Sequence, residues 1–288
     1  MKKFIFYFTV AFIFFLNNEV FAVKVMTFNI WTGSPHKKES FIAIIKKADP
    51  DIVIINEAND PATFYEMADA LGYDSVLSIH NKYNVGILSK YPILSHEFYQ
   101  LETLAKALVE VKIKFPDLDK PLYVFACHLV ALNLTGRNKK RAIEIDSILP
   151  YIQKRAGEYI VFAGDMNEES HLDRPMPNDC ISRAIEAIGL TDSYRNYYKC
   201  TEVCPGFTHN ILMIPTKRID YIYISSQLEV TDSQTLGKLF YNPWPSDHAA
   251  LISDIKLKEF PTTVLAISKI EDAPKKKSKR KKVVVDKK

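Results

Sequence analysis

Apolar and polar positions along the chain follow two different periods. Around Val109, Val111 and Ile113, apolar residues alternate with polar ones, which indicates a half-buried strand. From residue 38 to 48, apolar residues recur every three or four positions, which indicates an amphipathic helix. Three more segments have apolar spacing and end signals typical of helices: 61–71, 138–154 and 181–188.

Apolar β-type runs lie between these helices. They predict a first strand ending near Phe28, a strand up to Ala163, three closing strands, and strands over 51–58, 74–79, 84–90, 105–115 and 122–129. The strands fall into two β-rich halves, each with helices. This arrangement predicts an α/β fold of two packed β-sheets with helices on their outer faces.

The first 22 residues differ from the rest. Lys2 and Lys3 form a basic start, residues 4–16 are apolar, and 20–22 end in alanine. The apolar run is shorter than the about 20 residues of a membrane span, so we predict a signal peptide cleaved after Ala22. An uncleaved N-terminal anchor is the alternative. The predicted location is therefore periplasmic or secreted.

Charge is distributed unevenly along the chain. The formal net charge is +4, yet residues 275–288 hold nine Lys/Arg against Asp286 alone, or +8, and the first 22 residues add +1. The body from 23 to 274 therefore carries −5. We predict one folded domain over 23–260, acting as a monomer, and a basic, disordered tail over 261–288. The tail is either a solvated run or a contact for an anionic polymer or membrane surface.

Export makes the cysteines relevant. Cys127 lies in an apolar run and is predicted to be a buried free thiol. One disulfide is expected among Cys180, Cys200 and Cys204, with the Cys200–Cys204 pairing slightly favoured.

Six polar positions follow or begin strand-like runs. They are Asn29, Glu57, His128, Asp165 with Asn167, Asp220, and Asp247 with His248. Catalytic and binding groups gather where the strands of α/β sheets end, so we expect these side chains to meet.

Together these motifs resemble the exonuclease–endonuclease–phosphatase superfamily. The ordered set is Thr-Phe-Asn, Asn-Glu-Ala, Val-Gly-Ile-Leu-Ser-Lys, Cys-His-Leu, Gly-Asp-Met-Asn, Arg-Ile-Asp-Tyr-Ile and Ser-Asp-His, spanning about residues 23–257. The resemblance is nearest to exported bacterial members and implies a DNase I-like four-layer α/β sandwich of mixed sheets. Two departures are Asn56, where Gln is commoner, and Met166, where Phe or Thr is commoner.

A phosphodiester repels attacking water, so its hydrolysis needs a divalent cation and groups that move protons. The resemblance implies Glu57 as a ligand of Mg²⁺, with Mn²⁺ or Ca²⁺ as alternatives, supported by Asn29 and Asp247. Asp165 is predicted to orient or deprotonate the attacking water, and Asn167 to hold the nucleophile or a phosphate oxygen. His248, paired with Asp220, is predicted to stabilise the phosphate or handle a proton, with His128 acting from the other side.

Other residues have less context. Lys106, Arg137 and Arg141 face either substrate or solvent, and loop ordering is expected of His171 and Asp173. His80, His96 and His209 are expected at the surface or in loops. The aromatic residues Phe240, Tyr241 and Trp244 form either a pocket wall or loop packing.

The predicted activity is hydrolysis of a phosphate ester by an exported, magnesium-dependent enzyme. A nuclease acting on nucleic acid is the first hypothesis. A phosphodiesterase or phosphatase for a phosphorylated lipid or small molecule, similar to sphingomyelinases, is the alternative. A catalytically silent binding module is a third, which the intact site residues disfavour.

Overall fold

The computed structural model describes residues 22–79, 84–116, 118–131, 137–176, 180–199 and 202–258. Most of the predicted signal peptide, the predicted tail, His80 and Cys200 lie outside these ranges. Within them, no helix has both the length and the apolar content needed to cross a membrane.

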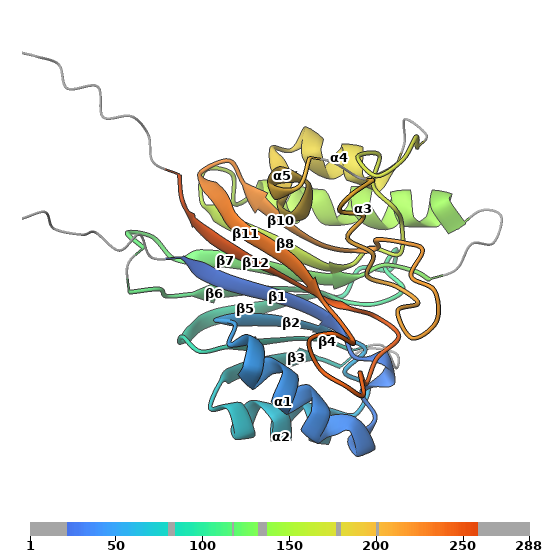
Figure 1. Ribbon diagram of the computed structural model, residues 1–288. Helices are drawn as coiled ribbons and strands as arrows, with labels where there is room; N and C mark the ends of the chain where they lie inside the picture. Colours follow the sequence, from blue (N-terminus) through green and yellow to red (C-terminus); the bar gives the residue numbers. More distant parts are fainter. Residues whose placement is uncertain are drawn as a thin grey trace, which may run out of the picture. The chain divides into compact units, whose positions relative to one another are not determined.

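Two six-stranded sheets form the centre of the folded part (Figure 1). The first has the order β11-β12-β1-β2-β4-β3, and the second the order β5-β6-β7-β8-β10-β9. The first sheet contains β1 (Val23–Asn29), β2 (Ile52–Asn56), β3 (Asp74–Ser78), β4 (Val85–Ser89), β11 (Leu228–Leu236) and β12 (Ala250–Leu257). The second contains β5 (Ile93–Tyr99), β6 (Leu108–Ile113), β7 (Leu122–His128), β8 (Tyr159–Asp165), β9 (Leu190–Asp192) and β10 (Asp220–Ser225).

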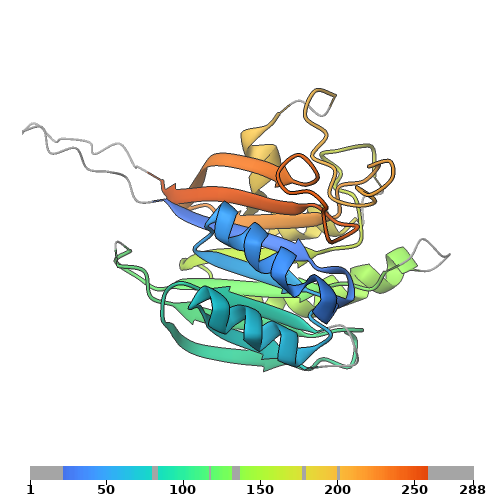
Figure 2. The same cartoon turned by 60° about the horizontal axis from the view of Figure 1, so that its bottom comes forward.

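Helices cover the outer face of each sheet. Figures 1 and 2 show α1 (Lys38–Ala48) and α2 (Pro61–Leu71) on the first sheet. On the second lie α3 (Arg137–Gln153) and α4 (Ile181–Ala187). Helix α5 (Ser193–Tyr197) packs against β10 and β11 instead, and its Tyr194 joins the core between the sheets. Two short 3₁₀ helices, Trp31–Gly33 and Pro35–Lys37, lead into α1. The predicted architecture of two mixed sheets flanked by helices is confirmed.

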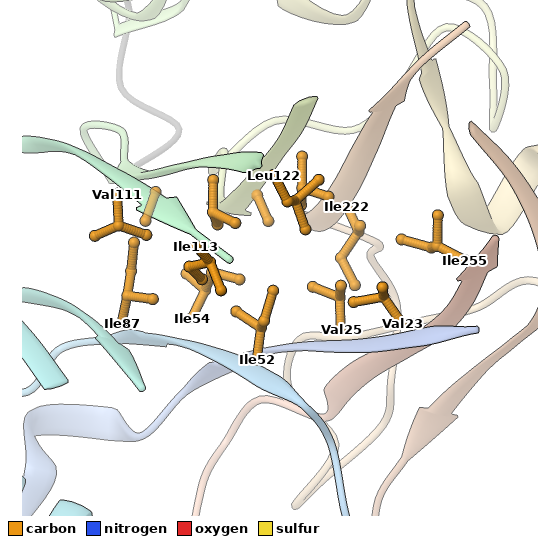
Figure 3. Packing of buried hydrophobic residues seen from close by; sticks show 14 of the residues in the cluster. Val23, Val25, Ile52, Ile54, Ile87, Val111, Ile113, Leu122, Ile222 and Ile255 are labelled. Atoms are coloured by element: carbon orange, nitrogen blue, oxygen red, sulfur yellow. The ribbon is translucent and has the colours of Figure 1, made fainter. Parts of the chain in front are cut away.

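Strand periodicity explains why both faces of each sheet are apolar. In β1, Val25 points toward the opposite sheet, while Met26 and Phe28 pack under the helices. Figure 3 shows the layer between the sheets, where Val25 and Ile54 meet residues such as Ile222. Each fully buried side chain of this kind contributes about 1.5–3 kcal/mol to stability.

Besides the two short 3₁₀ helices, the structure contains three elements that the sequence pattern did not indicate: β5, β9 and α5. Strand β5 lies at a sheet edge with most of its residues exposed, so its sequence lacks the apolar run that marks a covered strand. Strand β9 and helix α5 have three and five residues, too few to show a period.

The expected disulfide is wrong. Cys180 and Cys204 both have free thiols, and each of the three possible pairings includes at least one of them, so none of the pairings forms. The Cys180 sulfur is buried beside Ser182 Oγ at 3.4 Å, at the start of α4. Cys127 is a buried free thiol, as predicted.

Candidate active site

Strand register brings the predicted site residues to one edge of the sandwich. Asn29 and Asn56 are partners at the ends of the parallel strands β1 and β2, and Glu57 follows. In the second sheet, His128 and Asp165 are partners at the ends of the parallel strands β7 and β8. Asp220 begins the antiparallel strand β10 directly opposite Asp165. The two parallel strand pairs thus bring residues that are far apart in the sequence to neighbouring strand ends.

Asn56 joins the two sheets beneath the site. Its Nδ2 donates to the Cys127 carbonyl oxygen at 2.9 Å, and its Oδ1 accepts from the Asp165 backbone nitrogen at 3.1 Å. The residue is fully buried, so both halves of its amide need partners. Asn56, where the family more often has Gln, therefore fixes the distance between β2 and β8.

Gly164 allows β7 and β8 to approach closely just before Asp165. Its φ of 140° is accessible to glycine, and a Cβ at this position would lie 1.9 Å from the Cys127 carbonyl oxygen. Any side chain here would separate the strands that carry His128 and Asp165.

Asp165 is the centre of a buried hydrogen-bonded group. Its Oδ2 accepts from Asn29 Nδ2 at 3.0 Å and lies 3.4 Å from His128 Nε2. Burial and the charge of Asp220 raise the pKa of Asp165 to about 6, although His248 and Lys106 act in the opposite direction. A carboxylate with this pKa can exchange a proton near neutral pH.

His248 and Asp220 form the predicted pair. Nδ1 of His248 lies 2.8 Å from Asp220 Oδ2, and its Nε2 lies 3.9 Å from Asp165 Oδ2. Burial lowers the pKa of His248, but the charge of Asp220 and the hydrogen bond to it, with Asp165 and Asp247, raise it overall to about 10. His248 is therefore an imidazolium at neutral pH.

His128 has the opposite electrostatic character. Burial, with the positive charges of Lys106 and His248, lowers its pKa well below the usual range. A neutral imidazole can donate from Nε2 to Asp165, so His128 orients this carboxylate rather than adding positive charge.

Glu57 is held at the end of β2 by its backbone conformation and two hydrogen bonds. It has a left-handed backbone, with φ of 61°, directly after β2. Its Oε2 accepts from the Thr32 backbone nitrogen at 2.9 Å, and its Oε1 from Asn29 Nδ2 at 3.3 Å. Asn29 thus presents its amide nitrogen to Glu57 in this arrangement, and its own role as a metal ligand stays a prediction.

Asp247 supplies a second oxygen suited to a cation. Its Oδ1 is buried and has no hydrogen-bond partner among the described residues. An unpaired buried carboxylate oxygen is costly unless a cation neutralises it. The residues present therefore fit a hard divalent ion held by Glu57 and Asp247.

Two groups of three side chains have potential ligand atoms within 4.8 Å of one another: His209 with Asp247 and His248, and Asp165 with Asp220 and His248. The second is the hydrogen-bonded network described above. In that network Nδ1 of His248 and Oδ2 of Asp220 are already bonded to each other at 2.8 Å.

A pocket of about 530 Å³ opens above these groups. It is lined by Trp31, Thr32, Glu57, Ala105, Lys106, His128, Val130, Ala131, Asp165, Asn167, His209, Asp247 and His248. Asn167 has φ of 51°, and its Nδ2 donates to the Leu129 carbonyl oxygen. Lys106 Nζ donates to the same oxygen at 3.1 Å, so the two side chains lie together. The predicted residues Glu57, His128, Asp165, Asn167, Asp247 and His248 therefore share one pocket wall, with Asp220 buried behind it.

Lys106 faces the pocket, and the alternative of a solvated side chain is wrong. It is buried, and burial lowers its pKa to about 8 despite the charges of Asp165, Glu57 and Glu144. A poorly hydrated ammonium group at this position is suited to a phosphate oxygen.

His209 is a titratable site residue that sequence reasoning missed, and Trp31 and Thr32 also line the pocket without having been predicted. His209 lies in a loop, as expected, but pairs with His248 through a β-bridge and lines the pocket. The two rings are 4.9 Å apart in an edge-to-face arrangement, and burial with the charge of His248 lowers the pKa of His209. No pattern around Thr208-His209-Asn210 signals this position, because only strand pairing brings it to the site.

Several other expectations have clear outcomes. Arg141 is buried and paired with Glu168, so it faces neither substrate nor solvent. Trp244 packs on Phe28 and donates to the His248 carbonyl oxygen, which is loop packing. Asp173 binds Arg195 and Arg218, and so orders the loop before Asp220.

His171, His96 and Arg137 complete these outcomes. His171 contacts Ser182 and Glu186, consistent with loop ordering. His96 lies on the exposed strand β5. The side chain of Arg137 lies outside the described part of the chain.

Residues 26–248 match the model of the endonuclease/exonuclease/phosphatase family. The chain belongs to this family. Its members are hydrolases that act on phosphate esters and depend on a divalent metal ion. No curated protein sequence matches the chain.

Solved structures of this family share the fold. An endonuclease/exonuclease/phosphatase from Beutenbergia cavernae is 20% identical over 82% of this chain and 72% of its own, with a TM-score of 0.67. The human Nocturnin catalytic domain is 18% identical over 82% and 95%, with a TM-score of 0.66. Truncated TDP2 from Caenorhabditis elegans is 20% identical over 82% and 98%, with a TM-score of 0.63.

Proposed function

We propose that this protein is an exported, metal-dependent phosphodiesterase. The observation that supports it best is the position of Asp165, between the neutral His128 on one side and the cationic pair of His248 and Asp220 on the other. A base whose pKa is about 6, next to an imidazolium whose pKa is about 10, matches the needs of water attack on an anionic ester. The export part of the proposal is supported only by the basic and apolar pattern of residues 1–22.

In this proposal each side chain has a defined task. Asp165 accepts the proton of the attacking water, and the Asn167 amide holds a phosphate oxygen. The cationic His248 and Lys106 stabilise the charge that develops on the non-bridging oxygens. A divalent ion, with Mg²⁺ as the first candidate, would be held by Glu57 and Asp247 and would act as a Lewis acid when bound.

Nucleic acid is the first candidate substrate. One solved structure of similar fold, D. rerio TDP2, is described as complexed with a single-strand DNA product. The acidic body of the present chain, at −5, does not favour extended duplex binding, so a short or single-stranded segment fits better. A phospholipid diester is the second candidate, favoured by the exposed apolar residues Met213, Ile214 and Leu239 in loops next to the pocket.

The test is a parallel turnover assay of the full chain with Mg²⁺. Plasmid DNA, RNA, sphingomyelin, phosphatidylcholine, inositol phosphates and bis(p-nitrophenyl) phosphate are offered separately, with and without EDTA. Asp165→Asn is the inactive control, and Asp146→Asn on the exposed face of α3 is its match. Metal-dependent turnover lost only in Asp165→Asn supports the proposal. No turnover of any ester by the parent protein would indicate a silent binding module.

A further inference from the structure

Three strongly exposed apolar residues lie in loops next to the pocket residues His209 and Asp247. Among the described residues, Met213 is 77% exposed, Ile214 is 73% exposed and Leu239 is fully exposed. We call these three residues the apolar tip. A group of exposed apolar side chains on loops beside one pocket is a candidate interaction surface.

The apolar tip is formed by two loops that are joined to each other. Lys238 Nζ donates to the Leu212 carbonyl oxygen at 2.7 Å, so the loop after β11 lies against the loop before β10 (Figures 1 and 2). Within the second loop, Asn210 is bonded to both Met213 and Ile214 through backbone and side chain. The exposed side chains are therefore presented by a defined structure.

The base of these loops is anchored in the core. Ile211 is buried, and Leu212 and Phe240 pack against the helix-covered face of the first sheet. Ile211, Leu212 and Phe240 therefore pack in or against the core, whereas the side chains of the apolar tip are exposed. A local failure of packing therefore does not explain the exposure of the apolar tip.

The same loops touch the active site. Ile211 donates its backbone N–H to the Asp247 carbonyl oxygen at 3.0 Å, and His209 lines the pocket two residues earlier. A surface that receives the apolar tip would thus lie at the rim of the catalytic pocket.

The two segments that carry the apolar tip contain basic residues and no acidic ones. Residues 205–219 and 236–246 contain Lys217, Arg218 and Lys238 but no Asp or Glu. The guanidinium of Arg218 is already paired with Asp173 and Asp192, which leaves the two lysines near the tip. Aliphatic side chains flanked by lysines complement a bilayer surface that contains anionic phospholipid.

We infer that the apolar tip inserts into the surface of an anionic phospholipid bilayer and brings the catalytic pocket to it. Insertion of the apolar tip does not depend on the proposed function. The delivery of a phospholipid diester to the catalytic pocket does rest on it. Nucleic acid binding by the same loops is the competing outcome, because lysines also attract phosphate backbones. The exposed aliphatic chains favour the bilayer, since base stacking uses aromatic rings.

The experiment measures binding of the full chain to vesicles of phosphatidylcholine and phosphatidylglycerol at about three to one, at about 0.1 M and 0.5 M salt. High salt screens the basic tail, whereas aliphatic insertion persists. Two matched pairs of variants make the same substitution in the apolar tip and at an exposed position elsewhere. They are Ile214→Asp with Ile143→Asp on α3, and Leu239→Asp with Leu94→Asp on β5. We expect the two tip variants to bind at least about tenfold more weakly at high salt, and the two controls to bind as the parent does.

Turnover of bis(p-nitrophenyl) phosphate distinguishes docking from catalysis. It should be unchanged in the tip variants, which also verifies that they fold. Leu239→Trp should retain binding and shift its fluorescence to the blue on vesicles. Equal vesicle binding by tip and control variants, or loss of single-stranded DNA binding in place of vesicle binding, would overturn the inference. If the parent turns over no ester but the tip variants still lose vesicle binding, the proposed function fails while the docking surface stands.

Discussion

The two sheets have the same plan but place different chemistry at the pocket. Each has one parallel strand pair at its centre, β1 with β2 and β7 with β8, with antiparallel strands on both sides. The first pair ends in the half-buried Glu57, whereas the second ends in the fully buried Asp165.

Burial makes the difference between the two carboxylates. Asp165 lies in a closed network, and its pKa of about 6 makes it suited to exchanging a proton. Glu57 is held by a backbone N–H and an amide and faces the pocket, which suits a cation. One backbone arrangement can therefore support two tasks, depending on how much water reaches each strand end.

The largest loss of turnover is expected from a substitution at the site residues of the second sheet. Asp220→Asn should lower kcat by about 10³-fold, because His248 loses the carboxylate that orients and charges it. The measurement is kcat on bis(p-nitrophenyl) phosphate, with Asp146→Asn as control. Unchanged turnover per folded molecule, with a sharply lower melting temperature, would instead make Asp220 structural.

A substitution at Glu57, which follows β2 of the first sheet, should cause a loss of activity that depends on the metal concentration. Glu57→Gln should lower activity by about 100-fold at ordinary Mg²⁺, because an amide lacks the anionic oxygen that a hard cation prefers. Raising the metal concentration should restore part of this loss, but none of the loss in Asp220→Asn. Glu66→Gln, on the exposed face of α2, is the matched control. A Glu57→Gln protein that is fully active, or parent turnover in EDTA, contradicts the metal assignment.

The pH profile tests the second-sheet network in the unmodified protein. Asp165 must be deprotonated to accept a proton, so kcat/KM should fall as the pH drops through about 6. Lys106 loses its charge as the pH rises through about 8, which should lower activity in part. His248 must stay protonated, so activity should fall further as the pH rises through about 10, the alkaline limb. In Asp220→Asn this alkaline limb should move to lower pH. A profile in which Asp220→Asn leaves the alkaline limb in place would remove His248 from the role of cation.

The smallest effect on turnover is expected from the tail. Deleting residues 275–288 should change turnover of a small diester by less than about twofold, because every site residue precedes residue 249. Binding to DNA at several salt concentrations should lose part of its salt dependence, since fewer counterions are released. An identical salt slope with and without the tail would place the polyanion site on the folded body.

Local patterns explain how much of this molecule could be predicted from its sequence. Alternation around Val109 and helical spacing from 38 to 48 reflect the burial of one face, so the covered strands and helices were predictable. The chemistry-bearing residues were predictable because they stand where apolar runs end, as Asn29 and His128 do. Strand β5 was not, because an exposed edge strand imposes no such pattern.

The sequence indicated the candidate residues of the site, whereas the tertiary structure decided their neighbours and their protonation states. The pair of Asp220 and His248 spans 28 residues, and the bond between Asn29 and Asp165 spans 136. His209 and Lys106 enter the pocket only through strand pairing and the packing of loops. A pKa depends on burial and on neighbours in space, so the sequence by itself determined the fold class and the candidate groups, and only the folded chain determined their charges.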